Sequence, residues 1–144
     1  MICEDIIDAR NCGHVRCGLS ALAEPTVTDL AREFRLRDDA TIYKEIDATA
    51  ASRLIQTILQ KDMAYGCRIM STELSAELAA AFMQQFGSGA RYFTNGTYHV
   101  QRVQLSPTVW TGPSWDPATE ATFDTGVLVI GQAGSGCLWI EDED

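Results

Sequence analysis

The chain has 144 residues, of which 46% are hydrophobic and 22% charged, a composition typical of one globular domain. Its formal net charge of −9 disfavours contacts with nucleic-acid phosphates and anionic lipid headgroups, because both need a basic surface. We therefore expect a single domain, residues 1–144, that binds neither nucleic acid nor a membrane.

The N-terminal segment has few recognisable structural signals. Met1 to about Pro25 contains neither a basic start nor the long apolar run of a secretion signal, and suggests only a short helix around residues 4–9. The five cysteines of the chain are odd in number and irregularly spaced, unlike the disulfide framework of a small secreted protein. We expect a cytoplasmic protein in which most cysteines are reduced.

A short helix and a strand are expected next. Thr28 followed by Asp29 can cap a helix whose apolar side chains extend to Phe34. The alternating residues Thr41–Ile46 predict a strand.

Two amphipathic helices then occupy the middle of the chain. Asp47 is a suitable N-cap for the first, in which apolar residues recur at helical spacing from Ala51 to Met63. The second begins at Ser71 or Thr72 and places its last apolar side chain at Phe86. We expect both helices to pack on a sheet.

From there the apolar period changes to two, which indicates strands. Ala90–Thr94 and Thr97–Leu105 flank Asn95-Gly96, a strong signal for a type I′ hairpin turn. Thr122–Ile130 and Cys137–Ile140 complete a predicted antiparallel meander. The expected fold is α+β, with two amphipathic helices on one face of a mainly antiparallel sheet of four or five strands.

The connection Ser106–Thr119 contains three prolines and should be a surface loop. It carries Trp110 and Trp115, whose rings either dock into a partner from a stiffened backbone or fold back over the end of the sheet. We expect Trp139, in the last predicted strand, to lie in the core.

Acidic residues are concentrated at the end of the sequence. Val103 to Asp144 contains no Lys or Arg and supplies −7 of the net charge. One interpretation is an anionic surface for a basic protein partner, on the free sheet face or the loop at its end. The other is a solvated tail that blocks strand pairing and aids solubility. The predicted partner-binding residues are Trp110, Trp115, Asp116, Glu120, Asp124, Glu141, Asp142, Glu143 and Asp144.

The N-terminal segment offers a possible metal site. Cys3, Cys12, His14 and Cys17 are the residue types that hold tetrahedral zinc, although their spacing does not match a Cys-x-x-Cys knuckle. Buried thiols and a surface histidine are the alternative. His99, which has no acidic neighbour in sequence, is interpreted as a structural strand residue rather than a general base.

The segment from Phe123-Asp-Thr-Gly-Val-Leu-Val-Ile130 through Cys137-Leu-Trp-Ile-Glu-Asp-Glu-Asp144, with the small acidic chain around it, resembles the immunity proteins that bacteria make against their own toxins. The resemblance implies a non-enzymatic inhibitor, without cofactor or catalytic residues, that blocks the active site of a basic toxin or effector domain.

Two other functions remain open. One is a small enzyme or ligand-binding protein with a pocket near the loop 106–124, and the other is a zinc-stabilised adaptor built on the N-terminal Cys/His cluster. An enzyme requires a concave pocket with polar groups and shifted pKa values, whereas an inhibitor presents a flat or convex acidic surface.

Overall fold

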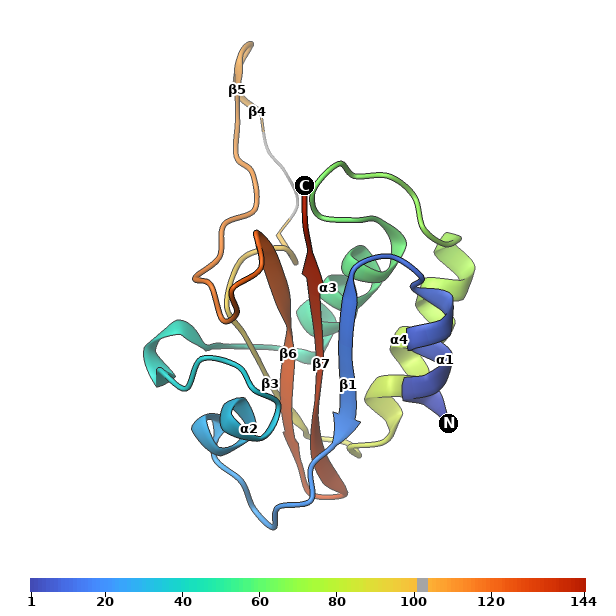
Figure 1. The fold of residues 1–144 in the computed structure, drawn as a ribbon, viewed down its shortest axis with the longest axis vertical. Helices are drawn as coiled ribbons and strands as arrows, with labels where there is room; N and C mark the ends of the chain where they lie inside the picture. Colours follow the sequence, from blue (N-terminus) through green and yellow to red (C-terminus); the bar gives the residue numbers. More distant parts are fainter. Residues whose placement is uncertain (101–103) are drawn as a thin grey trace.

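A five-stranded sheet in the order β1-β7-β6-β3-β2 organises the computed structural model, which describes residues 1–100 and 104–144 (Figure 1). Every neighbouring pair of strands is antiparallel. The strands are β1 (His14–Leu19), β2 (Lys44–Ile46), β3 (Arg91–Thr94), β6 (Phe123–Gly131) and β7 (Gly134–Asp142). The predicted α+β class is confirmed, with β3, β6 and β7 forming the C-terminal meander.

Helices cover both faces of this sheet. Helices α1 (Ile2–Ala9), α3 (Ala48–Gln60) and α4 (Thr72–Gln84) pack on one face over a core that includes Phe82 and Val127. Helix α2 (Val27–Glu33) and the 3-10 turn Ala40–Ile42 cover the other face, where Trp139 is fully buried. The expectation that Trp139 lies in the core is confirmed. Because both faces are covered, neither is a free surface for a partner.

Asp47 caps α3 as predicted, and Ser71, one of the two expected start residues, caps α4. The Asp47 carboxylate accepts a hydrogen bond from Ala50 N, and the Ser71 hydroxyl accepts one from Leu74 N. The cap of α2 is Thr26 rather than Thr28, because Thr26 and Asp29 form a reciprocal capping box. These bonds satisfy N–H groups that a helix leaves free in its first turn.

Asn95 and Gly96 do not form the predicted hairpin turn. Strand β3 pairs with β2 and β6, and neither residue has the positive φ that a type I′ turn requires. Gly96 instead runs so close to the segment around Ser114 that an added Cβ would lie 2.3 Å from its carbonyl oxygen. Of the predicted strand 97–105, residues 97–100 form a turn and 101–103 lie outside the described residues.

The N-terminal segment forms α1, where a short helix was suggested, and the edge strand β1, which was not predicted. A buried ion pair joins this segment to the C-terminus. The Arg10 guanidinium donates to both carboxylate oxygens of Asp142, at 2.9 and 2.7 Å. It also donates to Ile58 O, and Met63 N donates to the same carboxylate.

Within residues 1–100 and 104–144, no helix has the length and apolar content needed to cross a membrane.

Arg10→Met is therefore expected to destabilise the fold strongly, because it leaves the Asp142 charge buried without a partner. The free energy of unfolding should fall by about 3–5 kcal/mol, measured by chemical denaturation. Arg91→Met, which breaks the exposed pair between Arg91 and Glu45, is the matched control and should change stability far less. Equal effects of the two substitutions would contradict a structural role for the buried pair.

Candidate functional site

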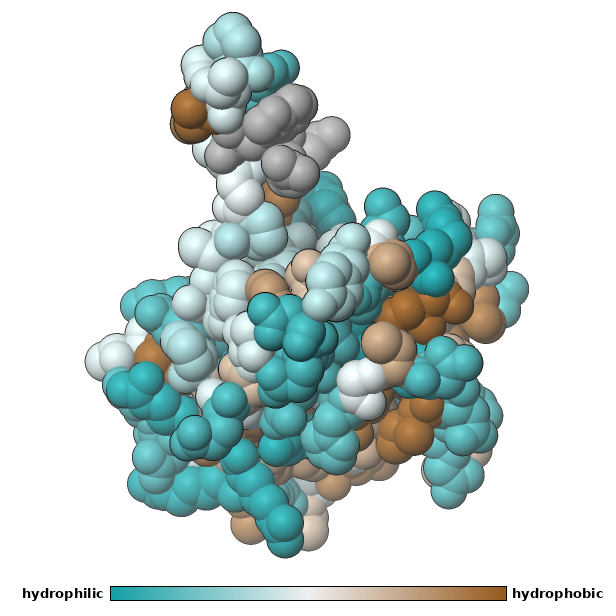
Figure 2. All heavy atoms as spheres, turned by 45° about the horizontal axis from the view of Figure 1, so that its top comes forward, coloured by the Kyte–Doolittle hydropathy of each residue, from teal (hydrophilic) through white to brown (hydrophobic). Residues whose placement is uncertain are grey.

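A narrow hairpin projects from one end of the sheet and stands clear of the rest of the surface (Figures 1 and 2). Strands β4 (Gln104–Ser106) and β5 (Val109–Trp110) form a separate two-stranded sheet among the described residues. Leu105 and Val109 are 64% and 49% exposed on this hairpin. The segment from Gln104 to Ser114 carries no charged residue, in contrast to the net charge of the chain.

Two chain segments that run side by side connect the hairpin to the sheet. Asp116 N donates to Asn95 O, and Thr97 N donates to Ser114 O, both at 2.8 Å. Gly96 forms an isolated bridge with Trp115 between these two bonds. We call the paired segments 95–97 and 114–116 the neck of the hairpin.

The neck is anchored by Asp124, which is fully buried. Its carboxylate accepts hydrogen bonds from Trp139 Nε1 at 3.0 Å, Asn95 Nδ2 at 3.1 Å and Ala118 N at 3.1 Å. Burial raises the pKa of Asp124 above its ordinary 3.8, while the N–H donors of Trp139, Ala118 and Thr119 oppose that rise. Asp124 is thus a structural residue of the core, and its carboxylate is not part of the surface.

The tryptophans differ in what they can offer to a partner. Trp115 is half-buried, and its ring lies 5.7 Å from the Tyr98 ring and 5.4 Å from the Phe123 ring. It therefore covers the end of β6, as the second of the two sequence interpretations expected. Trp110 belongs to β5, and its side chain lies outside the described part of the structure.

The C-terminal carboxylates are separated by the fold into internal and exposed groups. Asp142 is buried with Arg10, and Glu141 forms an ion pair with Arg16. Glu120 is exposed but lines a shallow depression together with Arg16, Arg35 and Arg37. Three carboxylates stay exposed near the neck and the C-terminus, namely Asp116, Glu143 and Asp144. The predicted acidic surface is therefore smaller than the sequence indicated.

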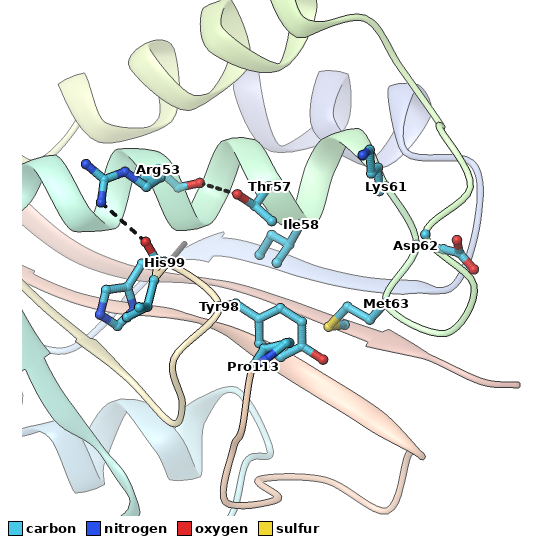
Figure 3. Close-up of a pocket in the computed structure, with 11 residues that line it drawn as sticks. Arg53, Thr57, Ile58, Lys61, Asp62, Met63, Tyr98, His99 and Pro113 are labelled. Carbon is cyan, nitrogen blue, oxygen red and sulfur yellow. Dashed lines mark hydrogen bonds between the residues drawn. The ribbon is translucent and has the colours of Figure 1, made fainter. Parts of the chain in front are cut away.

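A cavity of about 690 Å³ lies beside the neck (Figure 3). Helix α3 contributes Arg53 and Thr57, the chain after it contributes Lys61 and Met63, and the turn 97–100 contributes Tyr98. Among the described residues of the loop 106–124, Pro113 lines it, so the cavity borders this loop.

Two titratable groups of the cavity have shifted pKa values. Burial, together with the charges of Asp142 and Asp124, raises the pKa of Tyr98 to about 12, so its hydroxyl remains a donor. Burial and the nearby Arg53 lower the pKa of His99 below 6.5, so its imidazole is neutral at pH 7. His99 lies in a turn rather than in the expected strand, and its Nδ1 is buried without a hydrogen-bond partner among the described residues. Its place in the cavity had no signal in the sequence.

The zinc alternative is wrong because two of its four proposed ligands are bonded to each other in a disulfide. Cys3 and Cys17 form a disulfide that links α1 to β1, while Cys12 is an exposed free thiol and His14 is exposed in β1. Among the residues that the structure describes, no group of three or more His, Cys, Asp or Glu side chains could hold a metal ion. Cys12, Cys67 and Cys137 are free, so most cysteines are reduced, as expected.

In comparisons with known proteins, the chain matches no protein-family model, no curated protein and no solved structure. Its function is therefore argued from its own residues and surfaces.

Asp124→Asn tests the anchoring of the neck. Both carboxylate oxygens accept N–H groups, so replacing one with an NH2 group leaves at least one buried donor without an acceptor. The free energy of unfolding should fall by about 2–3 kcal/mol in urea denaturation. Asp116→Asn, at an exposed position, is the control, and identical unfolding curves for the two variants would disprove the anchoring role.

A thiol titration tests the disulfide. Without reductant, the native protein should show two fast-reacting thiols, Cys12 and Cys67, and a third from buried Cys137 only after unfolding. After both unfolding and reduction, all five thiols should react. Cys3→Ser with Cys17→Ser should lower the free energy of unfolding by about 3 kcal/mol, because the unfolded chain is no longer restricted by a closed loop. Five reactive thiols before reduction would contradict the bond.

Proposed function

We propose that this protein is a non-enzymatic inhibitor that binds a basic partner protein through the β4–β5 hairpin, in the manner of an immunity protein against a toxin. The observation that carries the proposal is an uncharged hairpin that projects from an acidic body with Leu105 and Val109 exposed.

The composition of the hairpin suits insertion into a cleft. Burying a charged side chain at an interface costs free energy unless an opposite charge compensates it, and this segment has no charge to desolvate. Burial of the Leu105 and Val109 side chains would favour binding through the hydrophobic effect. The bonded neck holds the hairpin in place before binding, which lowers the entropy cost of docking.

The exposed carboxylates supply the electrostatic part of the proposal. Asp116 is the last residue of the neck, and Glu143 accepts hydrogen bonds from the backbone N and the hydroxyl of Thr122. With Asp144, these side chains set a negative potential at the base of the hairpin. Such a potential raises the association rate with a cationic cleft and disfavours acidic competitors. The hairpin would fill the cleft while the carboxylates meet cations at its rim.

A neutralisation assay tests the proposal. Each gene adjacent to the one encoding this chain is expressed singly in a bacterial host, and any toxic product is co-expressed with this protein. We expect one toxic product to be neutralised by the wild-type chain. Leu105→Ser with Val109→Ser should abolish protection and weaken binding of the purified pair at least about tenfold, because two apolar contacts are lost.

The control carries two similar substitutions at the opposite end of the fold. Leu19 and Leu22 are 56% and 47% exposed there, so Leu19→Ser with Leu22→Ser removes comparable apolar surface without touching the hairpin. This variant should protect fully. Protection that survives the hairpin substitutions, or that is lost equally in both variants, would overturn the assignment of the hairpin as the binding element.

A further inference from the structure

The cavity beside the neck is bordered by two cationic side chains that have no acidic partner. None of the ion pairs formed within residues 1–100 and 104–144 includes Arg53 or Lys61. Asp62, the carboxylate next in sequence to Lys61, also lines the cavity, but its oxygens accept hydrogen bonds from Tyr65 N and Cys67 N, and it forms no ion pair within the described residues. In a chain of net charge −9, this is a local cationic site.

The two cations and Thr57 lie on one side of α3. Arg53, Thr57 and Lys61 are spaced by four residues, so they follow one another along the helix and its C-cap. The rise of 1.5 Å per residue separates the backbones of Arg53 and Lys61 by about 12 Å. Among the described residues, the Arg53 guanidinium makes a single long hydrogen bond, at 3.4 Å, to the carbonyl oxygen of His99. The cations therefore mark the two ends of the cavity.

Between them the lining is mostly apolar. Met63, Ile58, the Tyr98 ring and Pro113 surround the space (Figure 3). Its volume of about 690 Å³ falls within the range of sites for small organic ligands. The Tyr98 hydroxyl stays protonated and adds a neutral donor. A largely apolar lining with a cation at each end, and with the hydroxyls of Thr57 and Tyr98 in its wall, selects for an apolar body that carries acidic groups.

We propose that this cavity binds a small organic acid, with its aromatic or branched aliphatic body against Met63, Tyr98 and Pro113. At least one carboxylate, sulfonate or phosphate group of the ligand pairs with Arg53 or Lys61. The site is separate from the hairpin surface and opposite to it in charge preference, since the hairpin base attracts cations and the cavity attracts anions.

Two fluorescent probes with the same ring system test this site on the intact protein. Anilinonaphthalene sulfonate is an anion, and phenylnaphthylamine is its uncharged analogue. We expect the folded protein to bind the sulfonate with one-to-one stoichiometry and about tenfold more tightly than the analogue, because a charge-assisted contact is added. Nuclear magnetic resonance shifts on sulfonate binding should centre on the Tyr98 and His99 amides.

Matched variants separate the cavity from the overall charge. Arg53→Gln with Lys61→Gln should remove the preference for the sulfonate and leave binding of the uncharged analogue unchanged. Arg35→Gln with Lys44→Gln changes the net charge equally at exposed positions outside the cavity and should retain the preference. Met63→Gln should lower the affinity of the protein for both probes.

Three results would overturn the proposal. The first is equal affinity of the wild-type protein for the two probes, or no binding of either. The second is an equal loss of sulfonate affinity in the two charge variants, which would indicate a general charge effect. The third is a set of amide shifts centred on residues outside the cavity lining.

Discussion

The buried carboxylate of Asp124 is the contact on which the neck and the hairpin depend. It joins the start of the long connection between β3 and β6, at Asn95, to the return of that connection, at Ala118. It also accepts from Trp139 in β7, so the connection is tied to the centre of the sheet. One carboxylate can hold these segments together because its two oxygens accept hydrogen bonds from several N–H groups, and a charged acceptor forms stronger bonds than a neutral one. The hairpin and the cavity wall both extend from this point.

Local sequence signals predicted the elements that depend on local physics. Asp47 and Ser71 cap helices with an apolar stripe, and the apolar run of β6 sits at the centre of the sheet. The type I′ turn predicted at Asn95-Gly96 was wrong because that prediction considers only the backbone preferences of the two residues. In the fold, the Asn95 side chain donates buried hydrogen bonds to Asp124, and the close approach of Ser114 leaves no room for a side chain at Gly96. Both reasons involve residues far along the chain, which periodicity and propensity do not describe.

The same limit explains the acidic surface. The sequence separates basic and acidic residues, but the pairing of β1 with β7 brings them together in space. Arg16 meets Glu141 across that pair of strands, and Arg10 meets Asp142 at its end. An N-terminal segment with a weak strand signal gave no reason to expect this pairing. The run of acidic residues in the sequence therefore predicted a larger acidic surface than the fold presents. The exposed hairpin lies in a proline-rich stretch and was for that reason interpreted only as a loop.

The hairpin and the cavity share a border without sharing their binding groups. Tyr98 and Pro113 belong to the two segments that lead to the hairpin, so changes at these residues would disturb both sites. Arg53 and Lys61 belong to α3 and its C-cap, which are fixed independently by the core contacts of Leu54, Ile58 and Leu59. Leu105 and Val109 lie at the far end of the hairpin. An anion in the cavity would contact both segments below the hairpin, whereas a protein on the hairpin tip would not need to displace it.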